Sequence, residues 1–178
     1  MASLTVTTVL RKLRRSESGA EIIEFALTLP LLLLVVLGII EFGFVFQQYE
    51  VVTNAAREGA RIASLSTYGP TAATRVSNAT ARVNQYLTAG GLSTVGTTVC
   101  IGPATDDTTC DGTTSTTTLP GVGGVASTCV FTIRVRVSYP HPVPFVGKIV
   151  GYFGGTFPAL TLRGRSVMRT EAAAGLCP

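Results

Sequence analysis

One uninterrupted run without charge, Phe25 to Ile40, constrains this chain more than any other part of its sequence. A helix needs roughly 20 predominantly apolar residues to cross a bilayer core about 30 Å thick. Residues 22–46 are long enough, and Glu24 and Glu41 are their only charges. No small-residue cleavage site of the A-x-A kind follows the run, so a secretory peptide that is removed whole is the weaker interpretation. We therefore expect one membrane-spanning helix over about residues 22–46.

A basic cluster before this run predicts its orientation. Lys and Arg are retained on the cytoplasmic side, because crossing the bilayer is costly for them and the anionic inner leaflet attracts them. The topology signal consists of Arg11, Lys12, Arg14 and Arg15. We expect a single-pass protein of the inner (cytoplasmic) membrane with a cytoplasmic N-terminus and an extracytoplasmic C-terminus.

Glu24 does not fit a plain anchor, because a carboxylate near a bilayer face costs about a few kcal/mol unless it is paired or reaches the interface. It is the fifth residue after Gly19, and the pattern from Gly19 to Phe25 resembles the cut site of type IV pilin precursors. That resemblance implies that a prepilin peptidase cuts between Gly19 and Ala20, removes a leader of residues 1–19, and leaves the apolar helix on the mature subunit. The alternative is that Glu24 only snorkels to the headgroups.

The segments that follow narrow the resemblance to one family. They are Phe25–Leu34, Gly38–Gly43 and Thr53–Arg61, and together they resemble the TadE-like pseudopilins of tight-adherence (Flp) pilus systems. Further on, Val135–Pro140 and Ser166–Glu171 are similar to that family's closing strands. The resemblance implies a minor pseudopilin, a structural subunit that helps to assemble type IV class pili for surface adhesion. Its partners would be the prepilin peptidase and other pilin or pseudopilin subunits, reached through the N-terminal helix.

The net charge argues against nucleic-acid binding. The chain has 14 Lys and Arg against 10 Asp and Glu. Residues 1–19 hold four of the basic residues and one of the acidic ones, so 10 and 9 remain after Ala20. A basic pI normally raises the question of nucleic acid. Here the excess lies in the leader, where it serves as an orientation signal.

The remaining pattern predicts an α+β fold in which a long N-terminal helix, residues 20–67, is followed by an extracytoplasmic head, residues 70–178. Ala55, Gly59 and Ala63 form a stripe of small residues on the long helix, which could pack against neighbouring subunits or against the head itself. Apolar positions three and four apart predict a second helix from Ala72 to Leu87. We expect its apolar face to cover a small antiparallel sheet.

Strict alternation from Val130 to Tyr139 predicts a half-exposed strand whose outer face includes Arg134 and Arg136. We expect Thr94–Ile101 and Leu160–Thr170 to be its partners.

Three other segments have no regular pattern. The segment from about 105 to 124 is rich in Thr, Gly and Asp and predicts a surface loop. Pro140–Pro144 predicts a rigid turn without sheet donors. Phe145–Phe157 is apolar and rich in glycine, and it could pack under the sheet or form an exposed patch.

Four cysteines lie on the expected outer side, where an even set predicts disulfides. Four cysteines allow three pairings, and in one of them Cys100 with Cys110 would close the acidic loop while Cys129 with Cys177 would tie the C-terminus to the central strand. A zinc site is the competing interpretation, but there is no C-x-x-C spacing and His141 is the only histidine. Calcium at Asp106, Asp107 and Asp111 lacks EF-hand spacing, and the Asn78 glycosylation sequon is short enough to occur by chance. We expect no metal and no cofactor.

The sequence predicts no enzyme, because phosphate-binding, dinucleotide-binding and G-x-S-x-G motifs are missing and one histidine between prolines does not provide acid-base chemistry. We expect no catalytic residue and no small-molecule substrate. Two hypotheses remain. The first is the pilus-system subunit, and the second is an unprocessed single-pass envelope protein with an extracytoplasmic binding head.

Overall fold

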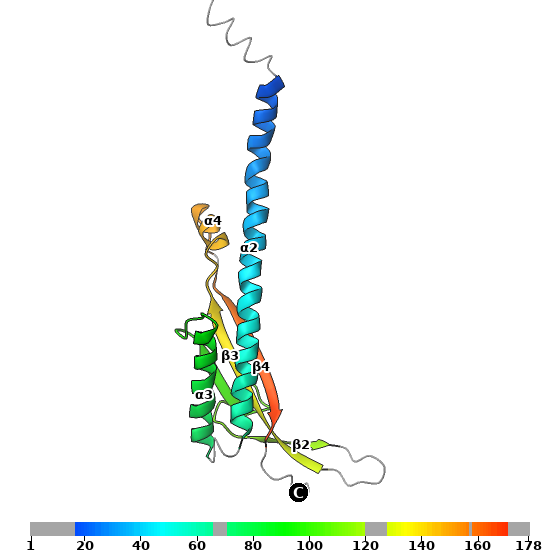
Figure 1. Cartoon of the computed structure of the whole chain (residues 1–178), viewed down its shortest axis with the longest axis vertical. Helices are drawn as coiled ribbons and strands as arrows, with labels where there is room; N and C mark the ends of the chain where they lie inside the picture. The colour runs from blue at the N-terminus through cyan, green and yellow to red at the C-terminus, as the bar shows by residue number, and fades with distance from the viewer. Residues whose placement is uncertain (1–16, 66–70, 120–127, 157, 171–178) are drawn as a thin grey trace, which may run out of the picture.

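The structure is a computed structural model that describes residues 17–65, 71–119, 128–156 and 158–170. Within these ranges the chain has the predicted α+β fold, and it contains three helices and four strands. The elements, in chain order, are α2 (Glu17–Ser64), α3 (Ala72–Ala89), β1 (Thr98–Pro103), β2 (Ser115–Leu119), β3 (Thr128–His141), α4 (Val146–Tyr152) and β4 (Leu160–Arg169). Figure 1 shows α2 extending far beyond the sheet, while α3 and the strands gather around its C-terminal half.

The helix α2 has 48 residues and is therefore about 72 Å long. It stays continuous through Pro30 and ends at Ser64, whose hydroxyl donates a hydrogen bond to the carbonyl oxygen of Arg61 (2.8 Å). Residue 67, at which the sequence predicts this helix to end, lies outside the described residues.

The second helix, α3, has both of its ends defined by side-chain and backbone hydrogen bonds. Thr71 caps its start, and Thr71 and Thr74 form a reciprocal capping box. At the other end, the backbone N–H of Leu92 bonds the carbonyl of Leu87 at 2.9 Å. Gly91 has a φ of 76°, a left-handed conformation that glycine adopts without steric cost. These local signals explain why the sequence predicts this helix well.

The sheet is antiparallel and is built around β3. β4 pairs with β3 along residues 132–141, while β1 pairs with 133–138 and β2 with 128–132. Thr132 pairs with Arg169 of β4 on one side and with Ser115 of β2 on the other. β1 and β2 therefore lie end to end along the edge of β3 that is opposite β4. Both predicted partners of the central strand are therefore confirmed.

Two segments predicted to be irregular belong to the sheet. Ser115–Leu119, within the predicted Thr-rich loop, forms β2, and its Ser115 hydroxyl lies 3.1 Å from that of Thr132. Threonine is β-branched and suits a strand once a partner supplies the hydrogen bonds. β3 also continues through Pro140 and His141, which pair with Thr161 and Leu160. β1 pairs only as far as Ser138, which leaves one edge of β3 free, and proline is tolerated on such an edge.

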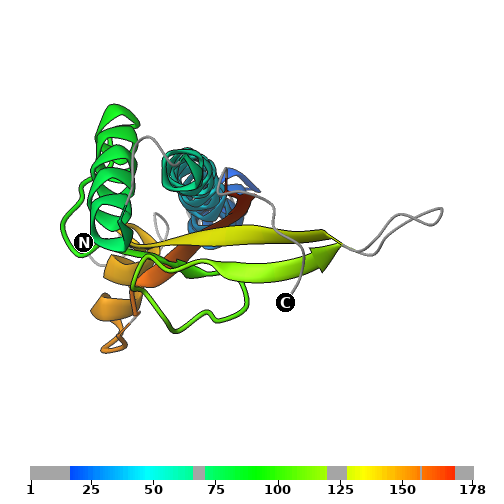
Figure 2. The ribbon, with the colours of Figure 1, turned by 90° about the horizontal axis from the view of Figure 1, so that it is seen from below.

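The core lies between the sheet and the two helices on one of its faces, as Figure 2 shows. α2 contributes small residues to it, and α3 and the sheet contribute larger ones. The buried side chains are Val52, Ala55, Ala56, Ala60, Ala63, Ala79, Val83, Leu87, Leu92, Ile101, Ile133, Val135, Val137, Tyr139 and Leu162. The predicted apolar face of α3 does cover the sheet.

Close contact between α2 and the head depends on residues without large side chains. A Cβ at Gly59 would lie 2.5 Å from Cγ2 of Val83, and one at Gly164 of β4 would lie 2.6 Å from the carbonyl oxygen of Val52. Ala55 and Ala63 are buried beside Gly59. Of the two interpretations of the small-residue stripe, packing against this protein's own head is the one that the structure shows.

The predicted exposure of Arg134 is wrong. The alternating pattern places this side chain on the exposed face, and the structure buries it completely. Its Nη1 lies 2.8 Å from Oδ1 of Asp107, and Nε and Nη2 donate to the carbonyl oxygens of Pro103 (3.2 Å) and Thr109 (2.9 Å). The loop after β1 therefore folds back over the outer face of the sheet. A strand pattern shows which face a side chain takes, but it does not show what covers that face.

We expect Arg134→Met to reduce the free energy of unfolding by about 2 kcal/mol, because it leaves the carbonyls of Pro103 and Thr109 without their donor. Arg165→Met is the control. Arg165 reaches the same carboxylate of Asp107 at 3.4 Å but is half exposed, so its loss should cost less than about 0.5 kcal/mol. Urea unfolding of the detergent-solubilised protein, followed by near-UV circular dichroism, measures both. Equal losses would contradict a structural role for the buried guanidinium.

The carboxylate of Glu58 on α2 forms ion pairs with two arginines, Arg61 on the same helix and Arg82 on α3, and so joins the two helices. Its Oε1 lies 2.9 Å from Nη2 of Arg61 and 2.8 Å from Nη2 of Arg82. Hydrogen bonds from Arg61 first, and then from Arg82, lower the pKa of Glu58 from 4.5 to about 2. A carboxylate whose pKa is lower in the folded state stabilises that state above its unfolded pKa, and this stabilisation disappears as the pH falls through the folded pKa.

We therefore expect Glu58→Gln to lose about 1 kcal/mol of unfolding free energy at pH 7, a value kept small because both arginines are partly exposed. The difference from the unchanged protein should shrink between pH 4.5 and about 2 and vanish below that range. Thermal unfolding across this pH series is the measurement. Glu50→Gln, at an exposed position on the same helix, is the control. A loss at Glu58 that persists at the lowest pH would contradict the ion-pair explanation.

Candidate functional site

Residues 20–46 form the exposed half of α2, a surface that the head leaves almost wholly uncovered. The most apolar window of the helix has a mean hydropathy of 2.6, and none of it is buried within the molecule. The exposed large side chains along it are Ile22, Ile23, Phe25, Leu27, Leu31, Leu32, Leu33, Leu34, Val35, Val36, Ile39, Ile40, Phe42, Phe44 and Phe46. Apolar surface of this extent requires a bilayer or a neighbouring molecule to cover it. α2 is long and apolar enough to cross a membrane, which fits a single-pass membrane protein.

The residues predicted for processing lie together in the first turns of this surface. Gly19 and Ala20 precede Glu24 and Phe25 on one continuous helix, and the last three are exposed. Ala20 and Glu24 are four residues apart, so their Cβ atoms lie about 5 to 6 Å from each other on one face. The topology signal, Arg11 to Arg15, lies outside the described residues, so the orientation stays a prediction.

An apolar hollow marks the middle of the exposed half. It has a volume of about 380 Å³ and is lined by Phe25, Thr28, Leu29, Leu31, Leu32, Val35 and Val36. The hydroxyl of Thr28 is turned back to the helix, where it donates to the carbonyl oxygens of Glu24 (3.0 Å) and Phe25 (3.2 Å). The hollow therefore presents carbon rather than oxygen to whatever covers it.

Glu41, which in the sequence only interrupts the apolar run, holds part of the head in the structure. It is only 6% exposed, and its Oε2 accepts hydrogen bonds from the backbone N–H groups of Phe145 (3.0 Å) and Val146 (3.3 Å). Its Oε1 has no partner among the described residues. Glu41 thus attaches the start of α4 to the exposed half of α2. No local signal reveals this contact, because the bonded residues are more than a hundred positions apart.

The described part of the apolar, glycine-rich segment, residues 145–156, contributes α4 and an exposed aromatic pair. Tyr152 is 88% exposed and Phe153 is 81% exposed, and their rings meet edge to face with centroids 5.6 Å apart. An apolar groove of about 310 Å³ separates α4 from α2. Its lining is Gly38, Glu41, Phe42, Val45, Val143, Val146 and Leu160. Of the two interpretations of this segment, the exposed patch is the one that the structure shows.

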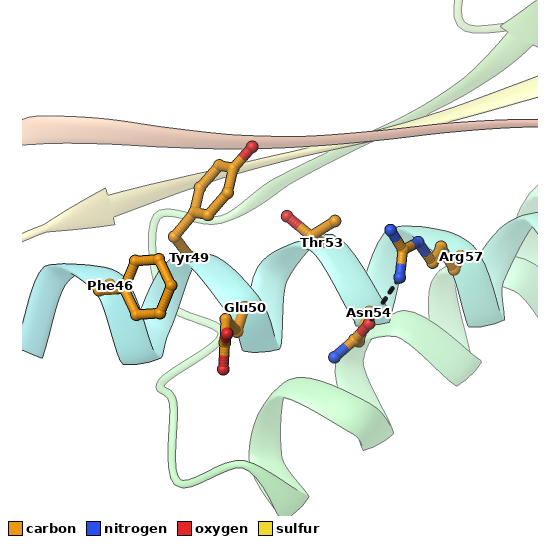
Figure 3. Close-up of a pocket in the computed structure, with 6 residues that line it drawn as sticks. All are labelled: Phe46, Tyr49, Glu50, Thr53, Asn54 and Arg57. Carbon is orange, nitrogen blue, oxygen red and sulfur yellow. Dashed lines mark hydrogen bonds between the residues drawn. The ribbon is translucent and has the colours of Figure 1, made fainter.

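A more polar hollow of about 340 Å³ follows along α2 (Figure 3). Its lining residues are Phe46, Tyr49, Glu50, Thr53, Asn54 and Arg57. Arg57 donates to Oδ1 of Asn54 at 3.3 Å, and the hydroxyl of Thr53 is buried without a partner in the described part of the chain. All six residues come from one helix. The hollow is therefore a gap between successive side chains, and its groups do not converge from several elements on one point.

One predicted disulfide is present and the other is only partly within the described residues. Cys100 and Cys110 are bonded, with Cα atoms 4.8 Å apart, and close the loop after β1. Such a short loop contributes about 2 to 3 kcal/mol in the chain-entropy account. Cys129 is also disulfide-bonded, and its predicted partner, Cys177, lies outside the described residues. That second pairing stays a prediction.

The carboxylates of the acidic loop accept hydrogen bonds from neighbouring threonines and from Arg134. Asp106 accepts from the hydroxyls of Thr108 (2.6 Å) and Thr109, and these bonds lower the pKa of Asp106. The hydroxyl and backbone N–H of Thr113 lower the pKa of Asp111 in the same way. Within the described ranges no three His, Cys, Asp or Glu side chains form a group that could hold a metal. The carboxylates thus organise the loop that covers Arg134.

The comparisons with known proteins concern the same helix. Residues 19–61 match the family model described as TadE-like protein, which confirms the resemblance predicted from the sequence. The match covers most of α2 and none of the sheet. No curated protein and no solved structure matches the chain.

Proposed function

We propose, from the TadE-like match over residues 19–61, that this chain is a minor pseudopilin, a structural subunit in the assembly of tight-adherence pili. The observation that supports it most is the division of α2. One face of its C-terminal half is buried by the head, while its N-terminal half is apolar and uncovered. A subunit that first resides in a membrane and then packs with other helices needs this division.

In this proposal a prepilin peptidase cuts between Gly19 and Ala20 on the cytoplasmic face of the inner membrane. Both residues lie in the first turn of α2, where the exposed apolar surface begins, so the cut would leave α2 from Ala20 onward on the mature subunit. The leader with its four basic residues would be removed after it has oriented the chain. The head remains outside the membrane, where its disulfide is stable.

Glu24 would compensate the new amino group of Ala20, either in its own chain or in an adjacent one. The two residues are one turn apart and both are exposed, so nothing in the head competes for the carboxylate. A negative charge near the start of a helix is also favoured by the helix dipole. In an apolar surrounding each charge alone would be strongly unfavourable, so pairing governs how neighbouring helices align.

The size of the head favours a minor rather than a major subunit. α3 and the four-stranded sheet pack against the C-terminal half of α2, which makes the head wide compared with the helix (Figure 1). The major pilins of the tight-adherence class are very short. A wide head restricts how closely copies can stack side by side, which is compatible with a few copies per pilus.

The first test is the N-terminus of the membrane protein, read by mass spectrometry in cells that make pili. We expect the mature chain to begin at Ala20. Gly19→Ala should reduce cutting only in part, whereas Gly19→Glu should abolish it, because a bulky charge blocks the peptidase site. Gly43→Ala is the matched control, since a Cβ there meets no atom within 4 Å. A chain that still begins at Met1 in cells with working pili would contradict the proposal and favour the unprocessed envelope protein.

The second test separates cutting from assembly. Glu24→Ala should leave the Ala20 terminus intact while reducing pili by at least about tenfold, because an unpaired charge in an apolar surrounding costs about 3 to 5 kcal/mol. Glu21→Ala is the matched control, since it removes another exposed carboxylate from the same helical turn and should leave pili unaffected. Electron microscopy with immunogold labelling counts the pili and locates the subunit. Normal pili in Glu24→Ala would contradict the pairing role.

A further inference from the structure

We propose that α4 and the aromatic pair Tyr152 and Phe153 dock into the outer interface of the bilayer that α2 crosses. The head would then touch the membrane at a second point besides its helix. The lipid surface is the occupant of this patch. The inference rests on the membrane anchoring in the proposed function, and it adds a site that the TadE-like match, which ends at residue 61, does not include.

The level of α4 along α2 is the first argument. The expected span begins at Ile22, and the rise from Ile22 to Glu41 is about 29 Å, close to the thickness of a hydrocarbon core. Glu41 therefore lies near the boundary opposite the one at Glu24. Its carboxylate holds Phe145 and Val146, so α4 begins at this boundary. Figure 1 shows α4 beyond the end of the sheet, beside α2 and toward its N-terminal half.

The side chains of this segment suit the interface in chemistry as well as in depth. Tyr152 and Phe153 project almost fully from the molecule, which is unfavourable for two large rings in water. Tyrosine and tryptophan concentrate where headgroups meet hydrocarbon. Phenylalanine is common on the apolar side of helices that lie in this interface. Lys148 is exposed on the same short helix, and a long basic side chain there can reach the phosphates while its stem remains in the apolar layer.

Continuity with the exposed half of α2 is the third argument. The groove between α4 and α2 contains Phe42, which is itself among the exposed apolar residues of α2, and it also contains Leu160 at the start of β4. Its lining is apolar apart from Glu41, whose side chain is buried, and it runs from the spanning helix onto the head. Acyl chains that cover the exposed half of α2 would extend into this groove.

Site-specific fluorescence tests the inference cleanly, because the chain contains no tryptophan. Tyr152→Trp and Phe153→Trp place a probe on the patch, at positions so exposed that folding should be unaffected. Val35→Trp reports the spanning part of α2, and Val167→Trp reports the exposed face of β4, toward the far end of that strand from α4. Each full-length variant is reconstituted into phosphatidylcholine and phosphatidylglycerol vesicles. The lipids are brominated either near the headgroup or near the end of the acyl chain.

We expect Tyr152→Trp and Phe153→Trp to lose fluorescence with lipids brominated near the headgroup. Val35→Trp should lose it most with the deep bromines, and Val167→Trp should keep it with both. Quenching at Val35 without quenching at either patch position would overturn the inference and leave the membrane anchor standing. Protection of the patch from aqueous iodide without bromine quenching would show that another protein copy covers it, which also overturns the inference. Failure to quench Val35→Trp would overturn the anchor and this inference together.

Discussion

The apolar contact between α2 and whatever surrounds it determines the rest of this molecule. A helix of 48 residues is far longer than the sheet and α3 can cover, so half of it must be covered by something other than this chain. The hydrophobic effect scales with the apolar area removed from water. The exposed half of α2 therefore has the largest unsatisfied driving force in the structure. Membrane residence and association with other subunits are the two ways of satisfying it.

The two halves of α2 differ in the size of the side chains on their surfaces, because one packs against the head and the other does not. Toward the head, Ala55, Gly59 and Ala63 let the helix lie close to the sheet, and Gly164 removes the side chain that would hold β4 away from Val52. Toward the N-terminus, leucine, isoleucine and phenylalanine project outward in every direction. A helix that is apolar all round suits a surrounding of lipid or other helices, whereas a narrow stripe of small residues suits one defined partner. The change in residue size along α2 divides anchor from head.

Local patterns were enough to predict the elements whose causes are local. Alternation along Val130 to Tyr139 predicted β3, and apolar spacing before Gly90 and Gly91 predicted α3. The failures all involve contacts between residues that are distant in sequence. Threonines at 115–119 become a strand only because β3 offers an edge, and Arg134 is buried only because a loop folds over it.

In the candidate site too, one part has a local sequence pattern and another depends on contacts between residues that are distant in sequence. The stretch from Gly19 to Phe25 carries its own local pattern, and the TadE-like match begins at its first residue. Glu41 was missed as an attachment point because its partners, Phe145 and Val146, come from the opposite end of the chain. A carboxylate in an apolar run signals that something compensates it. It does not identify the compensating groups, which here are the backbone N–H groups of Phe145 and Val146.

The lengthwise contact between α2 and the head has a mechanical consequence. α2 lies alongside β3 and β4 over much of their length, and its buried residues from Val52 to Ala63 are spread along the helix axis (Figure 1). A force that pulls on the N-terminal end acts along this axis and loads the contacts in shear, all at once. A force that peeled the helix sideways would break them one after another. The head is therefore attached to α2 in the geometry that best resists tension along the axis of this helix.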